Sequence, residues 1–210
     1  MQKKVVQQLN HVITVSHQSQ QDIVAAFDRP AGNIKVIPNG VDASIFKPLD
    51  TIARVPFRLI TTASSDQPLK GLSVLLRALA QSRSEFPELQ LIVIGKLKES
   101  GETQKELQTL NLQDAVQFKS GISNQQLVEE YAQASIAIVP SLYEGFGLPA
   151  AEAMACAVPL ICSDGGALPE VVGDAARLVR AGNVDDLQTA LHELLIDHEA
   201  REELGSQGRT

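Results

Sequence analysis

The sequence predicts a doubly wound α/β fold, in which helices cover both faces of a mainly parallel sheet. Short β-prone runs alternate with helical patterns through the chain, as in repeated β-α units. The run LQLIVIG at 89–95 is apolar almost throughout, which is typical of a strand buried on both faces. The run GLSVLLRALAQS places Leu72, Leu75, Leu76 and Leu79 on one helical face.

Composition narrows the class of protein. The 210 residues suffice for one domain or one and a half, and the net charge of −7 disfavours a nucleic-acid partner. Cys156 and Cys162 lack zinc-ligand spacing and have apolar neighbours, so we expect reduced, buried thiols. No run approaches the roughly 20 apolar residues of a membrane span, and MQKKVVQQLN lacks a signal-peptide core. We therefore expect a cytoplasmic protein.

The first 49 residues read as a small β-α-β segment with a hinge. HVITVS is the first expected strand, HQSQQDIVAAF a helix capped by Ser16 or Ser19, and NIKVIPNG the second strand. Asn39-Gly40 marks a turn, and residues 41–56 show no period. A boundary near residue 50 divides the chain into residues 1–49 and 50–210.

Regular alternation follows. The expected strands are FRLITTAS, LQLIVIG, AVQFKS, SIAIVPS, PLICS and ARLVR. The expected helices are GLSVLLRALAQS, a polar helix over about 101–110, NQQLVEEYAQA capped by Ser123 or Asn124, PAAEAMAC, a short one near LPEVVG, VDDLQTALHELLID and the polar end HEAREELGSQGRT. Ligands of such folds bind beyond the carboxyl ends of the strands. The candidate loops are therefore 64–71, 95–101, 119–123, 141–149 and 163–168.

The chain is organised around residues 135–159, where an apolar strand runs into a glycine-rich turn and a helix. Gly145 and Gly147 let the backbone approach a ligand closely, and Pro149 suits the first helical turn. The free amides of residues 146–151 and the helix dipole would then favour an anion.

Two glutamates and a lysine lie in these candidate loops. Glu144 and Glu152 do not suit a phosphate, but a carboxylate accepts two hydrogen bonds from one sugar diol. Lys70, after the loop SSDQPLKG, has the compact charge that a diphosphate needs. A ligand with both phosphate and hydroxyls fits this set. The alternatives are solvated glutamates, a simple strand-to-helix turn and a surface lysine.

These residues carry a family likeness. EGFGLPAAE (Glu144 to Glu152) has the E-x7-E form of the retaining GT-B-fold glycosyltransferases of group 1, also called family 4, which use nucleotide sugars. The likeness continues through AMACAVPLICSDGGALPEVVGDAARLV and extends to VITVSHQSQQDI, VIPNGVDASIFKP and Lys70-Gly71. The chain resembles this family over nearly its whole length.

The resemblance implies an architecture and a function. Residues 50–210 resemble the carboxyl-terminal, Rossmann-like, donor-binding domain, and residues 1–49 the end of the amino-terminal domain with the hinge at Pro38 to Asp42. The full enzyme would transfer the sugar of a UDP- or GDP-linked donor to an acceptor glycan, lipid or small molecule, with retention. The acceptor-binding part is absent here, so the resemblance implies that this piece alone is inactive. Peripheral membrane contact of the full-length enzyme stays open.

The resemblance also assigns roles to residues. Lys70 would bind the diphosphate and Glu144 the donor-sugar hydroxyls, and these two form the expected catalytic pair. Glu152 would bind the ribose. The remaining expected donor-binding residues are Gly145, Phe146, Gly147 and Leu148 around the sugar and phosphates, and Phe118, Lys119 and Ser120 along the base. No metal and no further cofactor are expected, because the lysine and the amides supply positive charge and the chain has no Asp-x-Asp motif.

The chain departs from the family pattern at two places. The family usually has a second diphosphate-binding cation, an arginine, where this chain has Ser64 and Ser65. Donor binding is then weaker or altered, or Lys96 or Lys98 substitutes. Ala157 replaces the glycine that usually ends the helix in the left-handed conformation, at a cost of about 1 kcal/mol.

Other functions compete with this one. Residues 145–150 also fit the G-x-G-x-x-G/A pattern of NAD-binding domains, with Asp164 about 20 residues on. That pattern lies in a late β-α unit, however, and adjoins Glu144. A non-catalytic nucleotide-binding module is the other alternative. Asp164 and Glu170 flank a turn near the cleft, where Gly165 and Gly166 serve loop geometry. We expect surface or packing roles for the histidines, which are His11, His17, His192 and His198.

Overall fold

The computed structural model describes residues 2–209. The strands are β1 (Val12–Thr14), β2 (Ile34–Val36), β3 (Arg58–Thr62), β4 (Gln90–Ile94), β5 (Val116–Lys119), β6 (Ile136–Val139), β7 (Leu160–Ser163) and β8 (Arg177–Val179). The α-helices are α1 (Gln2–Gln8), α2 (His17–Phe27), α3 (Leu72–Ser82), α4 (Glu102–Thr109), α5 (Asn124–Gln133), α6 (Leu148–Ala155), α7 (Leu168–Val172), α8 (Val184–Ile196) and α9 (His198–Gln207). Short 3₁₀ turns lie at η1 (Ala31–Asn33) and η2 (Pro68–Lys70).

The larger sheet is parallel throughout and has the order β5-β4-β3-β6-β7-β8. The chain enters at β3, winds outward through β4 to β5, and then returns to β6 beside β3. From β6 it winds to the other edge at β8. The winding direction therefore reverses between β3 and β6, which confirms the doubly wound fold.

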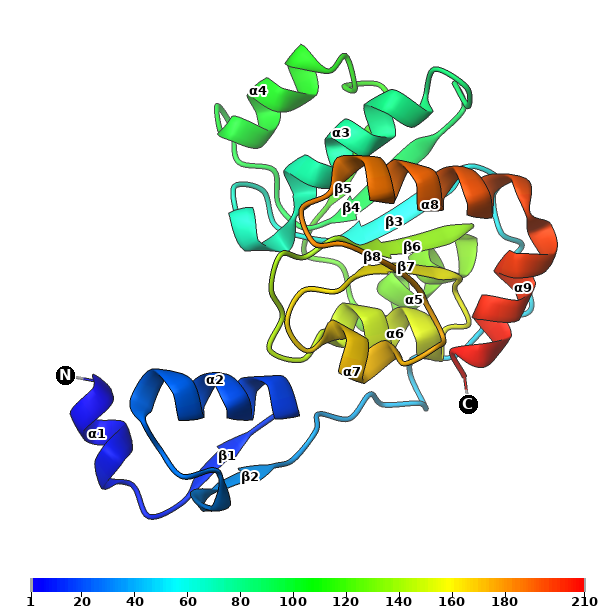
Figure 1. Ribbon diagram of the computed structural model, residues 1–210. Helices are drawn as coiled ribbons and strands as arrows, with labels where there is room; N and C mark the ends of the chain where they lie inside the picture. Colours follow the sequence, from blue (N-terminus) through cyan, green and yellow to red (C-terminus); the bar gives the residue numbers. More distant parts are fainter. Residues whose placement is uncertain (1, 210) are drawn as a thin grey trace.

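Helices cover both faces of this sheet, with α3, α4 and α8 on one side and α5, α6 and α7 on the other (Figure 1). Neighbouring residues of the central strands point to opposite faces. Leu59 and Leu91 pack in the core under α3 and α8, while Ile60 and Ile92 pack in the core under α5 and α6. Both faces of these strands are buried, which explains why the strands are apolar without alternation.

The amino-terminal residues form a separate small unit in which β1 and β2 pair in parallel and α2 packs beside them. Residues 37–57 contain neither a helix nor a strand and lead from this unit to the large sheet (Figure 1). Phe46 in this stretch is buried in the core under α5 and α6. The linker is thus attached to the larger domain, and the exact boundary near residue 50 stays a prediction.

The order of strands and helices from the sequence is confirmed, and the differences lie at element ends. Ser16, rather than Ser19, caps α2, and Ser123 caps α5 through a reciprocal bond pair with Gln126. The helix α6 begins at Leu148, one residue before the proline. The polar helix α1 and both 3₁₀ turns carry no apolar period, so the sequence did not indicate them.

The buried positions follow the sequence expectations as well. Leu72, Leu75, Leu76 and Leu79 are all buried on one face of α3. The two cysteines are free and buried, and burial raises the pKa of each thiol to about 12. Thiols that stay protonated under these conditions have little reactivity.

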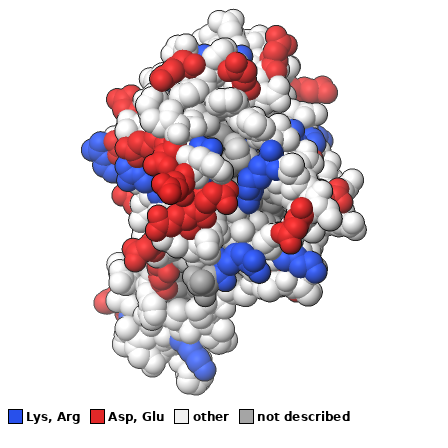
Figure 2. Space-filling model, turned by 90° about the vertical axis from the view of Figure 1, so that its right-hand side faces the viewer, with Lys and Arg blue, Asp and Glu red and all other residues white. Residues whose placement is uncertain are grey.

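The surface bears out the acidic composition. Figure 2 shows a face on which acidic side chains gather in one area and basic side chains form no continuous stripe. Within residues 2–209, no helix is both long and apolar enough to cross a bilayer.

Candidate nucleotide-sugar site

The loops that follow β3 and β6 diverge at the point where the winding direction reverses. Ligands of doubly wound folds bind at this switch point, because the two loops leave a crevice between them. Lys70 lies in the loop after β3, and Glu144 lies in the turn after β6. The topology therefore brings together two residues that are 74 positions apart.

Lys70 is placed by a close contact between its own loop and the end of β6. The following residue, Gly71, has a φ of +66°, and a Cβ there would lie 1.9 Å from the carbonyl oxygen of Pro140. The amide of Leu142 donates to the carbonyl of Leu69 over 2.8 Å. Only glycine allows this approach, so the Lys70-Gly71 pair fixes where the lysine emerges.

The ammonium of Lys70 contacts the carboxylate of Glu144, with 2.7 Å between Nζ and Oε1. The hydroxyl of Ser141 donates to the same oxygen over 2.8 Å. The side chain of Glu144 is 13% exposed, whereas that of Lys70 is 33% exposed. The site thus contains a partly buried ion pair whose lysine end reaches solvent.

The loop between β7 and α7 lies directly behind Glu144. The amide of Ala167 donates to the Glu144 carbonyl over 2.9 Å, and the amide of Glu144 donates to Gly165 over 3.3 Å. A Cβ on Gly166 would lie 2.3 Å from the Glu144 carbonyl oxygen. The two glycines in this loop therefore allow it to pack against the turn, as the sequence indicated.

The glycine-rich turn leads into α6 through Gly147. Gly147 has a φ of +103°, and a Cβ there would lie 2.5 Å from the side chain of Leu168. The carbonyl of Gly145 accepts hydrogen bonds from the hydroxyls of Ser16 and Ser19, at 2.7 and 3.2 Å. The expected turn is therefore present, and the small amino-terminal unit holds one of its peptide groups.

Glu152 lies in α6, on the side of the helix that faces α5. Its Oε2 is 3.3 Å from the hydroxyl of Tyr131, which is buried. Burial raises the pKa of the Glu152 carboxyl, and the bond from Tyr131 opposes this shift only in part. Glu152 has no contact with Lys70 among the hydrogen bonds and ion pairs of residues 2–209, so the two glutamates have separate surroundings.

Comparison with known proteins places the chain in a family. The family model for group 1 glycosyl transferases matches residues 53–210. The chain belongs to the group 1 glycosyltransferases. Its large sheet is the Rossmann-like sheet of a GT-B domain, as the resemblance implied.

Individual relatives of this glycosyltransferase chain agree with the family model. The MMP alpha-(1->4)-mannosyltransferase of Mycolicibacterium hassiacum is 43% identical over 100% of this chain and 51% of its own length. Sucrose-phosphate synthase (tll1590) from Thermosynechococcus elongatus matches with a TM-score of 0.85 and 29% identity, over 99% of this chain and 54% of its own. Anabaena HepE in complex with UDP-glucose matches in fold, with a TM-score of 0.84 and 22% identity over 95% and 58%. The chain spans about half the length of these relatives.

The segment expected along the base has mostly internal contacts in this chain. Phe118 packs against the core under α3 and α8, and Ser120 is exposed. The Nζ of Lys119 lies 2.5 Å from a carboxylate oxygen of Glu130, whose other oxygen lies 2.6 Å from Arg58. Nothing in these contacts tests a role toward a base, and that role stays a prediction.

The position that usually carries the family's second cation has a structural role here. Ser65 is buried, and its hydroxyl accepts from the amide of Lys98 over 2.8 Å. Ser65 thereby joins the loops after β3 and β4. The ammonium of Lys98 lies 4.0 Å from Asp66, and Lys96 is exposed. Substitution of the arginine by either lysine stays a prediction.

The amino-terminal unit contacts the larger domain at a second point, in α7, which sequence reasoning did not find. The carboxylate of Glu170 accepts from the amide of His17 at 2.9 Å and from that of Gln18 at 3.3 Å. A carboxylate at a helix N-terminus is stabilised by the free amides and the helix dipole. The sequence offers one weak signal for this contact, namely that Glu170 is an acidic residue in the first turn of α7.

The remaining predicted polar residues lie outside the switch point. His11 and His198 are exposed, His17 contributes its backbone amide, and His192 lies 3.1 Å from Glu85. Asp164 accepts from the amide of Ala181 over 2.7 Å. This bond closes the turn after β8, so the acidic residue that an NAD site would use has a structural partner.

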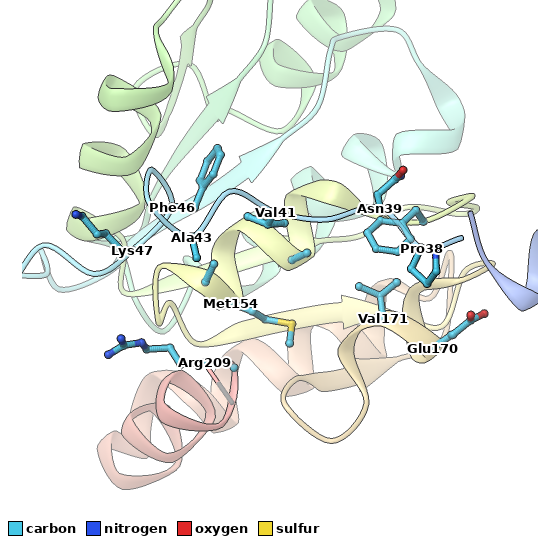
Figure 3. Close-up of a pocket in the computed structure, with 14 residues that line it drawn as sticks. Pro38, Asn39, Val41, Ala43, Phe46, Lys47, Met154, Glu170, Val171 and Arg209 are labelled. Carbon is cyan, nitrogen blue, oxygen red and sulfur yellow. The ribbon is translucent and has the colours of Figure 1, made fainter. Parts of the chain in front are cut away.

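A cavity of about 500 Å³ lies between residues 38–47, α6 and α7 (Figure 3). Lys47 and Arg209 lie toward one end of it, and Asn39 and Glu170 toward the other (Figure 3). Phe146 of the glycine-rich turn lines this cavity. Neither Lys70 nor Glu144 lines it, so it is separate from the contact between these two residues at the switch point.

Proposed function

We propose that this chain binds a nucleotide-sugar donor for a glycosyltransferase reaction, at the crevice between the loops after β3 and β6. The observation that carries the proposal is the meeting of Lys70 and Glu144 at the switch point, with 2.7 Å between Nζ and Oε1. A cation and an anion held side by side match a ligand that has a diphosphate next to a sugar. Family membership of residues 53–210 supports the same function.

Each charged side chain would bind a different part of the nucleotide-sugar donor. Lys70 exchanges Glu144 for the diphosphate and stabilises the negative charge that builds on the leaving group. Glu144 accepts from the donor-sugar hydroxyls, and Glu152 accepts from the ribose diol. The amides of residues 145–148 add positive potential beside the phosphates. With this field supplied by the protein, we propose that the reaction is metal-independent and needs no further cofactor. We propose retention on the family resemblance alone.

The relatives suggest where to begin with donors and acceptors. A mannosyltransferase is 43% identical over the whole chain, so a mannosyl donor linked to GDP or UDP is the first to test. Because the relatives are about twice as long, we infer that transfer to an acceptor glycan, lipid or small molecule needs residues beyond these 210. By this proposal the chain alone binds the donor without turning it over.

Calorimetry on the purified chain tests the binding step. UDP, GDP, UDP-glucose, GDP-mannose and NAD are titrated with and without EDTA. We expect one nucleoside diphosphate and its sugar to bind, NAD not to bind, and EDTA to change nothing. Lys70→Ala is expected to lose at least about tenfold in affinity, because it removes a charge-assisted contact.

Lys105→Ala is the matched control, since Lys105 forms an exposed ion pair with Glu102 in α4. An equal loss in both variants would mean a non-specific charge effect. No binding of any nucleotide at millimolar concentration would overturn the proposed function.

A non-catalytic nucleotide-binding module is the second candidate, and one observation favours it. The residue in place of the usual arginine, Ser65, is engaged in joining two loops and supplies no charge. Turnover separates the candidates. A longer protein that contains this chain is incubated with the donor that binds, and release of the nucleoside diphosphate is measured with and without acceptor sugars. Binding without any release would favour the module.

A further inference from the structure

The carboxylate of Glu144 has all of its protein donors on one oxygen. The ammonium of Lys70 and the hydroxyl of Ser141 both contact Oε1, at 2.7 and 2.8 Å. Among the hydrogen bonds of residues 2–209, none reaches Oε2. Two donors on one oxygen fix the plane of the carboxylate and leave the other oxygen able to accept from a ligand.

Ser141 is held more rigidly than Lys70. Its side chain and backbone are 2% exposed in total, and the hydroxyl of Ser163 donates to its carbonyl over 2.5 Å. Gly165 packs against the same carbonyl, since a Cβ there would lie 2.5 Å from it. A short side chain on a fixed backbone loses little entropy when it forms a hydrogen bond, whereas a lysine loses much more.

The two donors should therefore behave differently when the donor binds. Lys70 would weaken its contact with Oε1 on binding a diphosphate, because its ammonium then divides its three N–H donors and its charge between the two groups. Ser141 has no other partner for its hydroxyl in the described hydrogen bonds and stays in place. We propose that Ser141 is a positioning residue, which orients Glu144 toward a sugar hydroxyl once Lys70 contacts the diphosphate. This inference rests on the proposed function.

The consequence is that Ser141 acts on the sugar and not on the nucleotide. Its removal should lower the affinity for a nucleotide sugar and leave the affinity for the matching nucleoside diphosphate unchanged. The ratio of the affinity for the nucleotide sugar to the affinity for the nucleoside diphosphate isolates this effect. A merely structural role would lower both affinities together and leave the ratio as it was.

The experiment measures this ratio by calorimetry, with UDP against UDP-glucose or GDP against GDP-mannose, whichever pair binds. Ser141→Ala is expected to lower the ratio by about tenfold, the effect of one hydrogen bond to a charged group. Ser82→Ala is the matched control, because Ser82 is a buried serine in α3 whose hydroxyl has no partner. It should leave the ratio unchanged. If Ser141→Ala does not fold by circular dichroism, Ser141→Cys replaces it, since a thiol is a weak donor.

A double-mutant cycle with Glu144→Gln tests whether Ser141 acts through Glu144. In the Glu144→Gln background, Ser141→Ala should change the ratio less than twofold. Additive losses, or an unchanged ratio in Ser141→Ala with nucleoside diphosphate still bound, would overturn the inference alone. Failure of the unmodified chain to bind any nucleotide would overturn the proposed function, and the inference would fall with it.

Discussion

Glu144, which precedes α6, and Glu152, which lies inside it, differ in what surrounds them. Glu144, in the turn before the helix, has a lysine and a serine on one oxygen and the loop after β7 behind its backbone. Glu152, in the helix, has the hydroxyl of Tyr131 at 3.3 Å and a carboxyl whose pKa is raised by burial. The protein already stabilises the negative charge of Glu144, whereas it stabilises that of Glu152 only weakly.

This difference indicates what each glutamate gains from a ligand. A half-buried carboxylate with few donors is costly when charged, so hydroxyl donors from a ribose would stabilise Glu152 strongly. Glu144 must exchange an existing ion pair for new contacts, so its net gain is smaller. Binding of the nucleoside should therefore depend on Glu152, and recognition of the sugar on Glu144.

The largest expected effect is that of Glu152→Gln on the affinity for the nucleoside diphosphate. Loss of the charged acceptor should weaken binding by about tenfold to a hundredfold, because hydrogen bonds to charged groups contribute about 1.5–3 kcal/mol. Calorimetry with the nucleoside diphosphate measures it. Glu129→Gln, at a partly exposed position of α5, is the matched control. A loss of less than twofold would remove Glu152 from the ribose site.

Lowering the pH should reproduce part of this loss of affinity, because it protonates Glu152, and the loss should not exceed that of Glu152→Gln. Because burial raises the pKa of Glu152, its carboxyl takes up a proton at a higher pH than an ordinary glutamate. The affinity of the unmodified chain should fall as the pH falls through this raised value. Phosphate groups titrate as well, so Glu152→Gln, which keeps only the ligand's own titration, gives the baseline. Parallel pH profiles in both proteins would contradict the prediction.

The same shift has a consequence for the stability of the empty chain. A glutamate whose folded pKa is raised contributes stability below its unfolded pKa and loses that contribution as the pH rises through the folded value. Glu152→Gln should therefore melt at a higher temperature than the unmodified chain at neutral pH. The difference should shrink toward low pH. A lower melting temperature at neutral pH would show that the charged form is favoured in the fold.

Sequence patterns predicted the architecture because each signal was local. Buried strands such as 89–95 and the leucine face of α3 need only their own residues to be recognised, and both are confirmed. The meeting of Lys70 and Glu144 required the order of the strands. The family resemblance had assigned both residues to one site without giving that order, and the order of the sheet explains why they meet.

The contacts that the sequence missed depend on three-dimensional packing. No pattern marks the bond from Ser141 to Glu144, because it depends on the exact turn after β6. The contact of Glu170 with the amides of α2 joins residues 153 positions apart. The same holds for Lys119, whose contact with Glu130 follows from the packing of α5 on the sheet.

Glu144→Gln should act in the opposite direction to Glu152→Gln on the nucleoside diphosphate. The substitution releases Lys70 from its ion pair and removes a negative charge near the diphosphate, so affinity should rise by about three- to tenfold. The rise should shrink at high salt, because screening weakens exposed charge interactions. The measurement is calorimetry at two ionic strengths. A fall in affinity would mean that Glu144 contacts the nucleotide itself.

The smallest effect concerns the backbone at the two ends of α6. Gly147 before the helix has a φ of +103°, and Ala157 after it has a φ of +55°, so only the first position has the residue that suits a left-handed conformation. The left-handed conformation expected at Ala157 is thus confirmed, and its energetic cost stays a prediction. Its amide donates to Met154 over 2.8 Å and its carbonyl accepts from Arg54, and these bonds hold it in that conformation.

Ala157→Gly should stabilise the chain by about 1 kcal/mol, because glycine adopts this conformation without the steric cost of a Cβ. Ala155→Gly is the matched control two residues earlier, at the last helical residue of α6, where the same change should destabilise by about 0.5–1 kcal/mol. Urea unfolding of both variants gives the two free energies. Equal destabilisation by both substitutions would mean that the backbone at Ala157 is not strained.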